Sequence, residues 1–168
     1  MGLFGKLFES ADSAVVYNSS EILAPIKGEY IKLEEIEDEV FSQGILGMGC
    51  GIRPVDNIVY APFPGTISSV ADTKHAVGIT TVDGGEFLIH VGMDTVEMNG
   101  DGFKVYVSAG DRIKAGQKLL EFDLDKIKAA SHPTTTAFVL TNSDEFSNLK
   151  LDTNGSFEAK VKVGSYGK

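Results

Sequence analysis

The sequence predicts an all-β fold, an antiparallel β-sandwich with one or two short helical segments. From Glu21 onward, short apolar stretches rich in β-branched residues alternate with Gly, Pro, Asn and Asp at intervals of about eight to twelve residues, a spacing typical of sandwiches and barrels. The 19 glycines suit this architecture, because tight turns require residues that tolerate positive φ. Residues 23–30 and 60–67 also share one pattern, in which an apolar residue, Ala-Pro, two further residues and Gly precede a strand.

The first segment, residues 1–19, is expected to be a flexible or amphipathic N-terminal tail. Its apolar side chains recur at the helical spacings of three and four, as Leu3, Phe4, Leu7, Phe8 and Ala11. An isolated helix of this length is marginal in water. Lys6 stands against Glu9 and Asp12 and offers little attraction for an anionic membrane surface. The folded domain is expected to comprise residues 20–168.

Further elements follow the repeated pattern. Residues 109–120 contain a turn, a short stretch, a second turn and an apolar strand. Two charge-rich segments, 36–43 and 124–130, are predicted to form short helices that cover the sheets. Together these elements resemble the barrel-sandwich hybrid, and in particular its duplicated form, seen in lipoyl and biotinyl carriers and their relatives.

Composition and charge limit the classes of function. A chain of 168 residues, 42% hydrophobic and 23% charged, is expected to form one soluble domain with a sizeable core. No apolar run approaches the roughly 18 residues of a membrane span. The net charge of −9, without a block of Lys or Arg, argues against nucleic-acid binding. The lone Cys50 excludes an internal disulfide, and no signal peptide is evident, so we expect a cytoplasmic protein.

The most informative stretch is a predicted β-hairpin that contains two histidines. Asp83-Gly84 separates two β-rich runs, which favours a tight two-residue turn. With that turn His90 faces Val77, and His75 becomes its diagonal neighbour on the same face, at a separation of about 7–8 Å. If Gly85 joins the loop, the pairing shifts by one residue and the histidines fall on opposite faces. The prediction that the two imidazoles meet therefore depends on the hairpin register.

Two facing imidazoles suit three kinds of chemistry. They are compatible with a metal site that needs further ligands, with a general acid and base pair, and with a nucleophilic histidine steadied by a second imidazole. Residue types and spacing leave these three open. His90 interrupts an apolar run, which favours a functional role. Thr73 is placed to hydrogen-bond a ring nitrogen of His75 and to fix its tautomer.

The strings around these histidines are similar to one protein family. Residues 73–76 (Thr-Lys-His-Ala), 86–96 (Glu-Phe-Leu-Ile-His-Val-Gly-Met-Asp-Thr-Val) and 100–103 (Gly-Asp-Gly-Phe) together resemble the glucose-family enzyme IIA of the bacterial phosphoenolpyruvate-dependent sugar phosphotransferase system. The two Ala-Pro patterns, Gly47-Met48-Gly49 and Phe122-Asp123-Leu124 fit the same family. The similarity covers about residues 20–150, in order and with long ungapped stretches.

The resemblance implies a phosphotransferase component with a phosphohistidine intermediate. Such proteins are antiparallel β-sandwiches in which one histidine accepts a phosphoryl group from the carrier HPr and passes it to the enzyme IIB domain of a sugar permease. By position the acceptor is His90, His75 is the second histidine required for onward transfer, and Thr73 is its hydrogen-bonding companion. The resemblance further implies that residues 20–168 form an enzyme IIA type-1 domain. We expect a monomer, peripheral to a membrane permease, that requires no cofactor.

The resemblance also implies a docking surface around the histidines. Acidic residues would attract a basic partner, and apolar residues would form a collar on which donor and acceptor dock. The candidates are Asp38, Val40, Phe41, Ile45, Leu46, Leu88, Asp94 and Val96. Family members also regulate other transporters or kinases, and His75 and His90 can hold zinc together with a partner carboxylate. Ala71 stands where the family often has an aromatic residue, which puts partner preference in question.

Three other functions fit the sequence less well. A swinging-arm carrier of the lipoyl or biotinyl type presents a modified lysine in a hairpin turn, but residues 83–85 (Asp-Gly-Gly) contain no lysine. A zinc hydrolase of the sandwich peptidase type needs a third ligand and usually a His-x-His pair, which the sequence lacks. A purely structural module would give the paired histidines no role.

Overall fold

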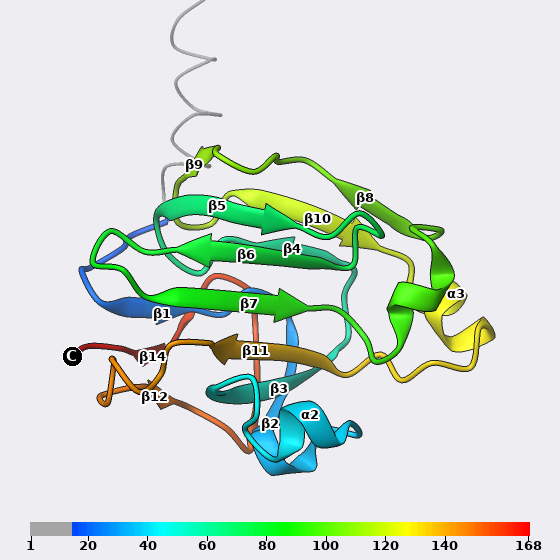
Figure 1. The fold of residues 1–168 in the computed structure, drawn as a ribbon, viewed down its shortest axis with the longest axis horizontal. Helices are drawn as coiled ribbons and strands as arrows, with labels where there is room; N and C mark the ends of the chain where they lie inside the picture. The colour runs from blue at the N-terminus through cyan, green and yellow to red at the C-terminus, as the bar shows by residue number, and fades with distance from the viewer. Residues whose placement is uncertain (1–14) are drawn as a thin grey trace, which may run out of the picture.

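Antiparallel strands are the main regular elements of the computed structural model, which describes residues 15–168 (Figure 1). The strands form open sheets that pack on one another, so the predicted all-β antiparallel sandwich is confirmed. The apolar stripe predicted from Leu3 to Ala11 lies outside the described residues. Within residues 15–168, no helix is both long enough and apolar enough to cross a membrane.

One large sheet dominates the fold, and every pair of neighbouring strands in it is antiparallel. Its strand order is β13 (Gly155–Phe157), β2 (Gly28–Lys32), β3 (Met48–Pro54), β11 (Thr136–Leu140), β7 (Glu86–His90), β6 (Ala76–Thr80), β5 (Gly65–Val70) and β9 (Arg112–Ile113). One smaller sheet has the strand order β4 (Ile58–Tyr60), β10 (Lys118–Phe122) and β8 (Phe103–Val105). A second has the order β1 (Glu21–Leu23), β14 (Lys162–Ser165) and β12 (Lys150–Leu151). Strands β6, β7 and β11 thus lie at the centre of the large sheet (Figure 1).

Buried apolar side chains form two clusters on opposite faces of the large sheet. The larger cluster lies between this sheet and the smaller ones, and β7 contributes Phe87 and Ile89 to it. The smaller cluster lies on the outer face, where Leu88 of β7 packs beside Val139 of β11. Because side chains alternate along a strand, β7 is covered on both faces, and the residues near its end are held from both sides.

The described chain contains four short helical segments. They are η1 (Leu33–Glu35), α2 (Glu39–Ser42), η2 (Thr95–Met98) and α3 (Leu124–Ala129). The predicted helix at 124–130 agrees closely with α3. The predicted helix at 36–43 is shorter than expected, because Asp38 caps it only from residue 39 and Gly44 ends it with φ of +74°. The 3-10 helices η1 and η2 were not predicted from the sequence.

The two Ala-Pro patterns occupy equivalent places, as their similarity predicts. In the first, β1 ends at Leu23 and β2 begins at Gly28. In the second, β4 ends at Tyr60 and β5 begins at Gly65. Each pattern therefore connects a strand of a small sheet to a strand of the large sheet.

The β6–β7 hairpin differs from both registers considered for it. His90 faces Ala76, and the Thr81 N–H bonds to the Gly85 carbonyl at 2.8 Å, so the loop contains three residues, 82–84. The Thr81 hydroxyl accepts the Gly85 N–H at 2.8 Å and donates to the Asp83 carboxylate at 2.6 Å. Gly84 alone in the loop has positive φ, which fits a three-residue turn and not the predicted two-residue turn.

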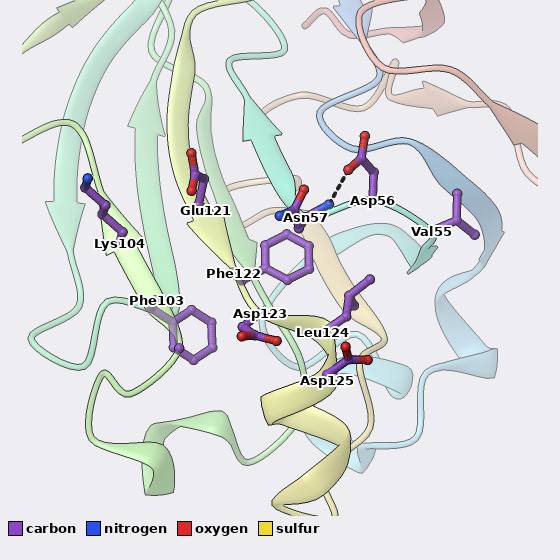
Figure 2. A pocket seen from close by; sticks show the side chains of 11 residues that line it. Val55, Asp56, Asn57, Phe103, Lys104, Glu121, Phe122, Asp123, Leu124 and Asp125 are labelled. Atoms are coloured by element: carbon purple, nitrogen blue, oxygen red, sulfur yellow. Dashed lines mark hydrogen bonds between the residues drawn. The ribbon is translucent and has the colours of Figure 1, made fainter.

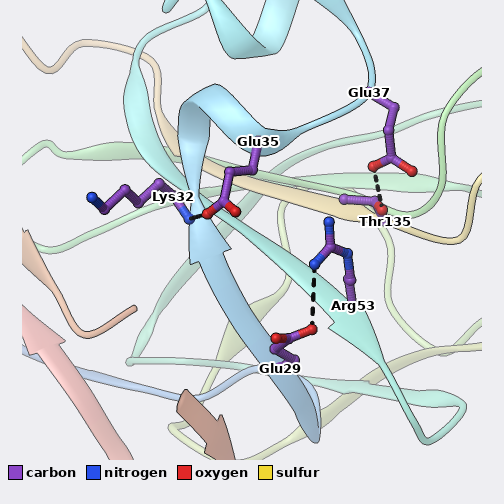
Figure 3. A network of polar contacts seen from close by, with 6 residues as sticks. All are labelled: Glu29, Lys32, Glu35, Glu37, Arg53 and Thr135. Atoms are coloured by element: carbon purple, nitrogen blue, oxygen red, sulfur yellow. Dashed lines mark hydrogen bonds and ion pairs between the residues drawn. The ribbon is translucent and has the colours of Figure 1, made fainter. Parts of the chain in front are cut away.

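Polar contacts attach the segment that leads into α2 to the large sheet (Figure 3). The Glu37 carboxylate accepts a hydrogen bond from the Thr135 hydroxyl at 2.7 Å, just before β11. The Lys32 N–H donates to Glu35 Oε2 at 2.9 Å, which closes η1 at the end of β2. Arg53 pairs with Glu29 across β2 and β3 at 3.4 Å. These contacts fix the segment from which α2 reaches the end of β7.

Candidate functional site

His75 and His90 meet at one end of the β6–β7 pair. Their ring centroids are 4.6 Å apart and the rings are nearly perpendicular, at 85°. His90 is the last residue of β7, and His75 immediately precedes β6. In the observed register, strict alternation would put the two side chains on opposite faces. They meet because His75 lies just before β6, outside the paired residues, so the alternation of the strand does not fix the direction of its side chain.

The backbone around His75 is shaped by a left-handed residue. Lys74 has φ of +64°, and its N–H bonds to the Ala71 carbonyl at 2.8 Å, which turns the chain between β5 and β6. The His75 carbonyl then accepts the Val91 N–H at 2.8 Å. This bond ties the turn before β6 to the segment after β7, and it thereby places the two histidines side by side.

A carbonyl group fixes the tautomer of His90. Its Nδ1 lies 2.9 Å from the Gly92 carbonyl oxygen, and a carbonyl only accepts hydrogen bonds, so Nδ1 carries the proton. In the neutral ring Nε2 then has the free lone pair. Gly92 is required here, because its φ is +72° and an added Cβ would lie 2.5 Å from Thr95 Cγ2. The role of the Gly92 carbonyl was not predicted from the sequence.

His75 is buried and is held by Thr73, as predicted. The Thr73 hydroxyl lies 2.8 Å from His75 Nδ1, a contact that suits either direction of donation. The Phe103 ring also packs against the His75 ring, at a centroid distance of 6.4 Å. Burial and, to a lesser extent, the charge of nearby His90 together lower the pKa of His75 from 6.5 to about 4, whereas a hydrogen bond to the Thr73 backbone opposes the shift.

The pKa of His90 is also lowered, and burial is again the main cause. The hydrogen bond to the Gly92 carbonyl and the negative charges of Asp38 and Asp94 oppose the shift. Both imidazoles are therefore neutral near pH 7, and His90 presents an unprotonated Nε2. This is the protonation state in which an imidazole acts as a nucleophile.

The predicted docking residues divide into exposed and covered ones. Val40, Ile45, Leu46 and Val96 are exposed apolar side chains. Leu88 is half-buried and packs on the small cluster, and Phe41 is buried with its ring 5.0 Å from that of His90. Among the acidic residues, Asp94 is exposed with φ of +60°, whereas half-buried Asp38 caps α2. Met48 at the start of β3 is also an exposed apolar residue, but its strand partner Leu140 faces Phe87, at the opposite end of β7 from His90.

The residues described here do not form a complete metal site. No group of three or more His, Cys, Asp or Glu side chains is arranged for a metal ion within residues 15–168. A structural zinc ion takes four ligands, so His75 and His90 fit only half of such a set, and a partner would have to supply the rest. Cys50 is buried, and burial raises its pKa to about 12, which makes the thiol unreactive.

A separate pocket of about 590 Å³ lies beside the start of α3 (Figure 2). It contains neither histidine. Its lining includes Val55, Asp56, Asn57, Phe103, Lys104, Glu121, Phe122, Asp123, Leu124 and Asp125. Of its polar groups, Asp123 caps α3 and Asp56 accepts the Asn57 N–H. Phe103 lines this pocket and also packs against His75, which itself does not line it.

Comparisons with known proteins agree with this arrangement. A family model described as phosphoenolpyruvate-dependent sugar phosphotransferase system, EIIA 1, matches residues 20–146. The chain is 41% identical over 150 residues to the PTS system glucose-specific EIIA component of Staphylococcus epidermidis, with 89% of each chain covered. It is 40% identical over 152 residues to the PTS system beta-glucoside-specific EIIBCA component of Bacillus subtilis, which covers 90% of this chain and 25% of that protein.

A solved structure has the same fold. The glucose permease IIA from Mycoplasma capricolum aligns with a TM-score of 0.80 at 36% sequence identity, covering 86% of this chain and 93% of that one. The match of the family model to most of the chain, and the relatives above 30% identity, together establish the family. The chain therefore belongs to the EIIA 1 family of the phosphoenolpyruvate-dependent sugar phosphotransferase system.

Proposed function

We propose that this chain is a phosphocarrier in which His90 accepts a phosphoryl group from phospho-HPr and passes it to the enzyme IIB domain of a glucose-type sugar permease. The observation that best supports the proposal is the 2.9 Å hydrogen bond from His90 Nδ1 to the Gly92 carbonyl, beside a second imidazole. This bond leaves the Nε2 lone pair available to phosphorus. Membership of the EIIA 1 family supports the same role.

The first transfer forms a bond between His90 Nε2 and phosphorus. The phosphorus–nitrogen bond of phospho-HPr breaks, and its electron pair returns to the donor imidazole. Positive charge develops on the His90 ring, and the Gly92 carbonyl stabilises it through Nδ1–H. The second transfer reverses these steps with His90 as the leaving group. Because phosphoryl transfer depends mainly on positioning and charge stabilisation, a firmly held imidazole is suited to both directions.

In this proposal His75 stabilises the transferred phosphoryl group. We infer that the Thr73 hydroxyl, 2.8 Å from His75 Nδ1, is the donor in this contact, so that Nε2 of His75 would carry the proton and donate to a phosphate oxygen. The low pKa of His75, about 4, keeps it neutral with a single proton near pH 7. Thr73 thus selects the tautomer that has a donor facing the phosphoryl group.

Partners would dock on the surface around the histidines. Val40, Ile45 and Leu46 follow Asp38 on one side of the site, and Val96 follows Asp94 on the other, and all four apolar side chains are exposed. Apolar residues next to carboxylates fit a transient partner that has a matching apolar patch with basic residues around it. We propose that this exchange takes place in the cytoplasm, next to the membrane permease.

The test is phosphorylation of the purified chain with phosphoenolpyruvate, enzyme I and HPr, measured by intact mass under mildly basic conditions. We expect one acid-labile phosphoryl group on the wild type and on His75→Gln, and none on His90→Gln. Subsequent addition of enzyme IIB and sugar should remove the group from the wild type rapidly but from His75→Gln only slowly, by a factor of about 100 or more. An unmodified wild type with active donors present would contradict the proposal.

A further inference from the structure

One aromatic residue, Phe41, covers the side of His90 that faces α2. The two ring centroids are 5.0 Å apart, and the rings are tilted by 54°. Phe41 itself is only 5% exposed. The His90 ring therefore has three close restraints: the Gly92 carbonyl on Nδ1, the perpendicular His75 ring, and the Phe41 ring.

The position of Phe41 is defined by contacts that do not involve His90. Asp38 Oδ1 accepts the Val40 N–H at 2.9 Å and the Phe41 N–H at 3.3 Å, which fixes the first turn of α2. The Phe41 side chain is buried in the small outer cluster, which includes Ala137, the β11 residue paired with His90. The 2.7 Å bond between Glu37 and Thr135 ties the preceding residues to the same edge of β11 (Figure 3). Phe41 is thus held in place before any partner binds.

We propose that Phe41 is a positioning residue for His90, whose ring keeps the imidazole in the orientation that directs Nε2 toward an incoming phosphoryl group. The inference rests on the proposed phosphocarrier function. It reassigns Phe41, which the sequence placed among the docking residues, because a side chain this buried offers little surface to a partner. Its neighbour Val40, 44% exposed, remains suited to docking.

The physical reason lies in the rotation that His90 would otherwise have. His90 is the last residue of β7, and the next position on the same face, Gly92, has no side chain to restrict its ring. A flat aromatic face limits rotation in a way that an aliphatic side chain of similar apolarity does not. Displacement of a reacting atom by about 1 Å is enough to slow a reaction by up to about a hundredfold. Loss of the Phe41 ring is therefore expected to affect the transfer step itself.

The test compares Phe41→Leu with two control variants. Nitrogen-15 NMR of the unphosphorylated proteins measures the tautomer of His90, and phosphorylation rates are measured with phospho-HPr and with phosphoramidate, a donor too small to use the docking surface. Val40→Ser controls for docking, and Leu33→Ala controls for lost packing in the same cluster. We expect Phe41→Leu to reduce the population of the His90 Nδ1–H tautomer and to slow phosphorylation by both donors about tenfold. Val40→Ser should slow only phospho-HPr, and Leu33→Ala should preserve the tautomer.

The outcomes separate this inference from the proposed function. If the wild type is phosphorylated on His90 and Phe41→Leu slows only the reaction with phospho-HPr, Phe41 is a docking residue and the inference is wrong. If Leu33→Ala changes the tautomer as much as Phe41→Leu does, the effect is one of general packing, and the inference is again wrong. If the wild type accepts no phosphoryl group, the proposed function fails, whereas the NMR comparison still tests whether Phe41 orients His90. Phe41→Met serves as the second variant if Phe41→Leu does not fold.

Discussion

The two ends of the β6–β7 pair each have a threonine hydrogen bond and a glycine with positive φ, but they differ in what these features hold in place. At the loop end, the Thr81 hydroxyl accepts the Gly85 N–H, Gly84 has positive φ, and Val82 is 94% exposed. At the histidine end, Thr73 holds His75, Gly92 has positive φ, and both imidazoles are covered. The loop end closes a turn, whereas the histidine end fixes two reactive rings. The difference lies in what covers each end, because only the histidine end has α2 and the chain after β7 packed beside it.

The two glycines give the sharpest contrast between these ends. Gly84 has φ of +95° with nothing within 4 Å of an added Cβ, whereas at Gly92 that Cβ would lie 2.5 Å from Thr95 Cγ2. Gly84→Ala should cost about 1–2 kcal/mol, the strain of a left-handed residue. Gly92→Ala should cost about 2–4 kcal/mol, since a steric clash is added. Urea denaturation checks both values.

The same pair of variants also differs in the expected phosphorylation rate. Gly92→Ala moves the carbonyl that holds His90 Nδ1, so we expect the rate of phosphorylation by phospho-HPr to fall by about a hundredfold. Gly84→Ala should be phosphorylated by phospho-HPr at the wild-type rate. Equal losses of rate in the two variants would mean that the hairpin acts as one unit and that the contrast between its ends is false.

A pH titration of stability tests the buried state of His75. Its pKa is about 4 in the folded chain and 6.5 when exposed, so between these values the unfolded chain binds more protons. The contribution to folding stability is complete above pH 6.5 and is lost as the pH falls toward 4, by up to about 3 kcal/mol. His75→Gln should flatten the pH dependence of the free energy of unfolding, whereas Gly84→Ala should lower that free energy equally at each pH. An unchanged slope in His75→Gln would show that His75 is not buried as described.

Two threonines supply the smallest contrast. Thr81→Val should reduce stability by about 1–2 kcal/mol, because the buried Gly85 N–H loses its side-chain acceptor, and it should leave transfer to enzyme IIB unchanged. Thr73→Val should change stability by less than about 1 kcal/mol and slow transfer to enzyme IIB about tenfold, because His75 loses the contact that selects its tautomer. The rate of phosphoryl transfer from each phosphorylated variant to enzyme IIB distinguishes the two. Slow transfer from Thr81→Val would argue against this division.

The fold was largely predictable because its signals are local. Gly and Pro punctuation, the two Ala-Pro patterns and the α3 segment all appear where the sequence placed them. The register of the β6–β7 hairpin was not predictable in this way, because the Asp-Gly signal predicts a two-residue turn only if the flanking side chains form no hydrogen bonds with the loop. Here the Thr81 hydroxyl binds both Gly85 and Asp83, which favours a loop of three residues.

The candidate site was predicted for a reason that proved only partly correct. His75 and His90 do meet, and Thr73 does contact His75, but the histidines converge from the ends of strands and not from one face. The contact between Phe41 and His90 could not be derived from spacing, because it joins segments almost fifty positions apart through tertiary packing. Roles for the docking residues stay predictions.

The edges of the large sheet have a consequence for how concentrated the protein can become. Its two outermost strands, β9 and β13, are two and three residues long, whereas the inner strands have five to seven. A short edge exposes few unpaired N–H and C=O groups to a neighbouring molecule. Open sheets commonly aggregate by pairing such edges, and here little edge is available to pair. The chain should therefore tolerate crowding at high copy number without forming intermolecular β-structure.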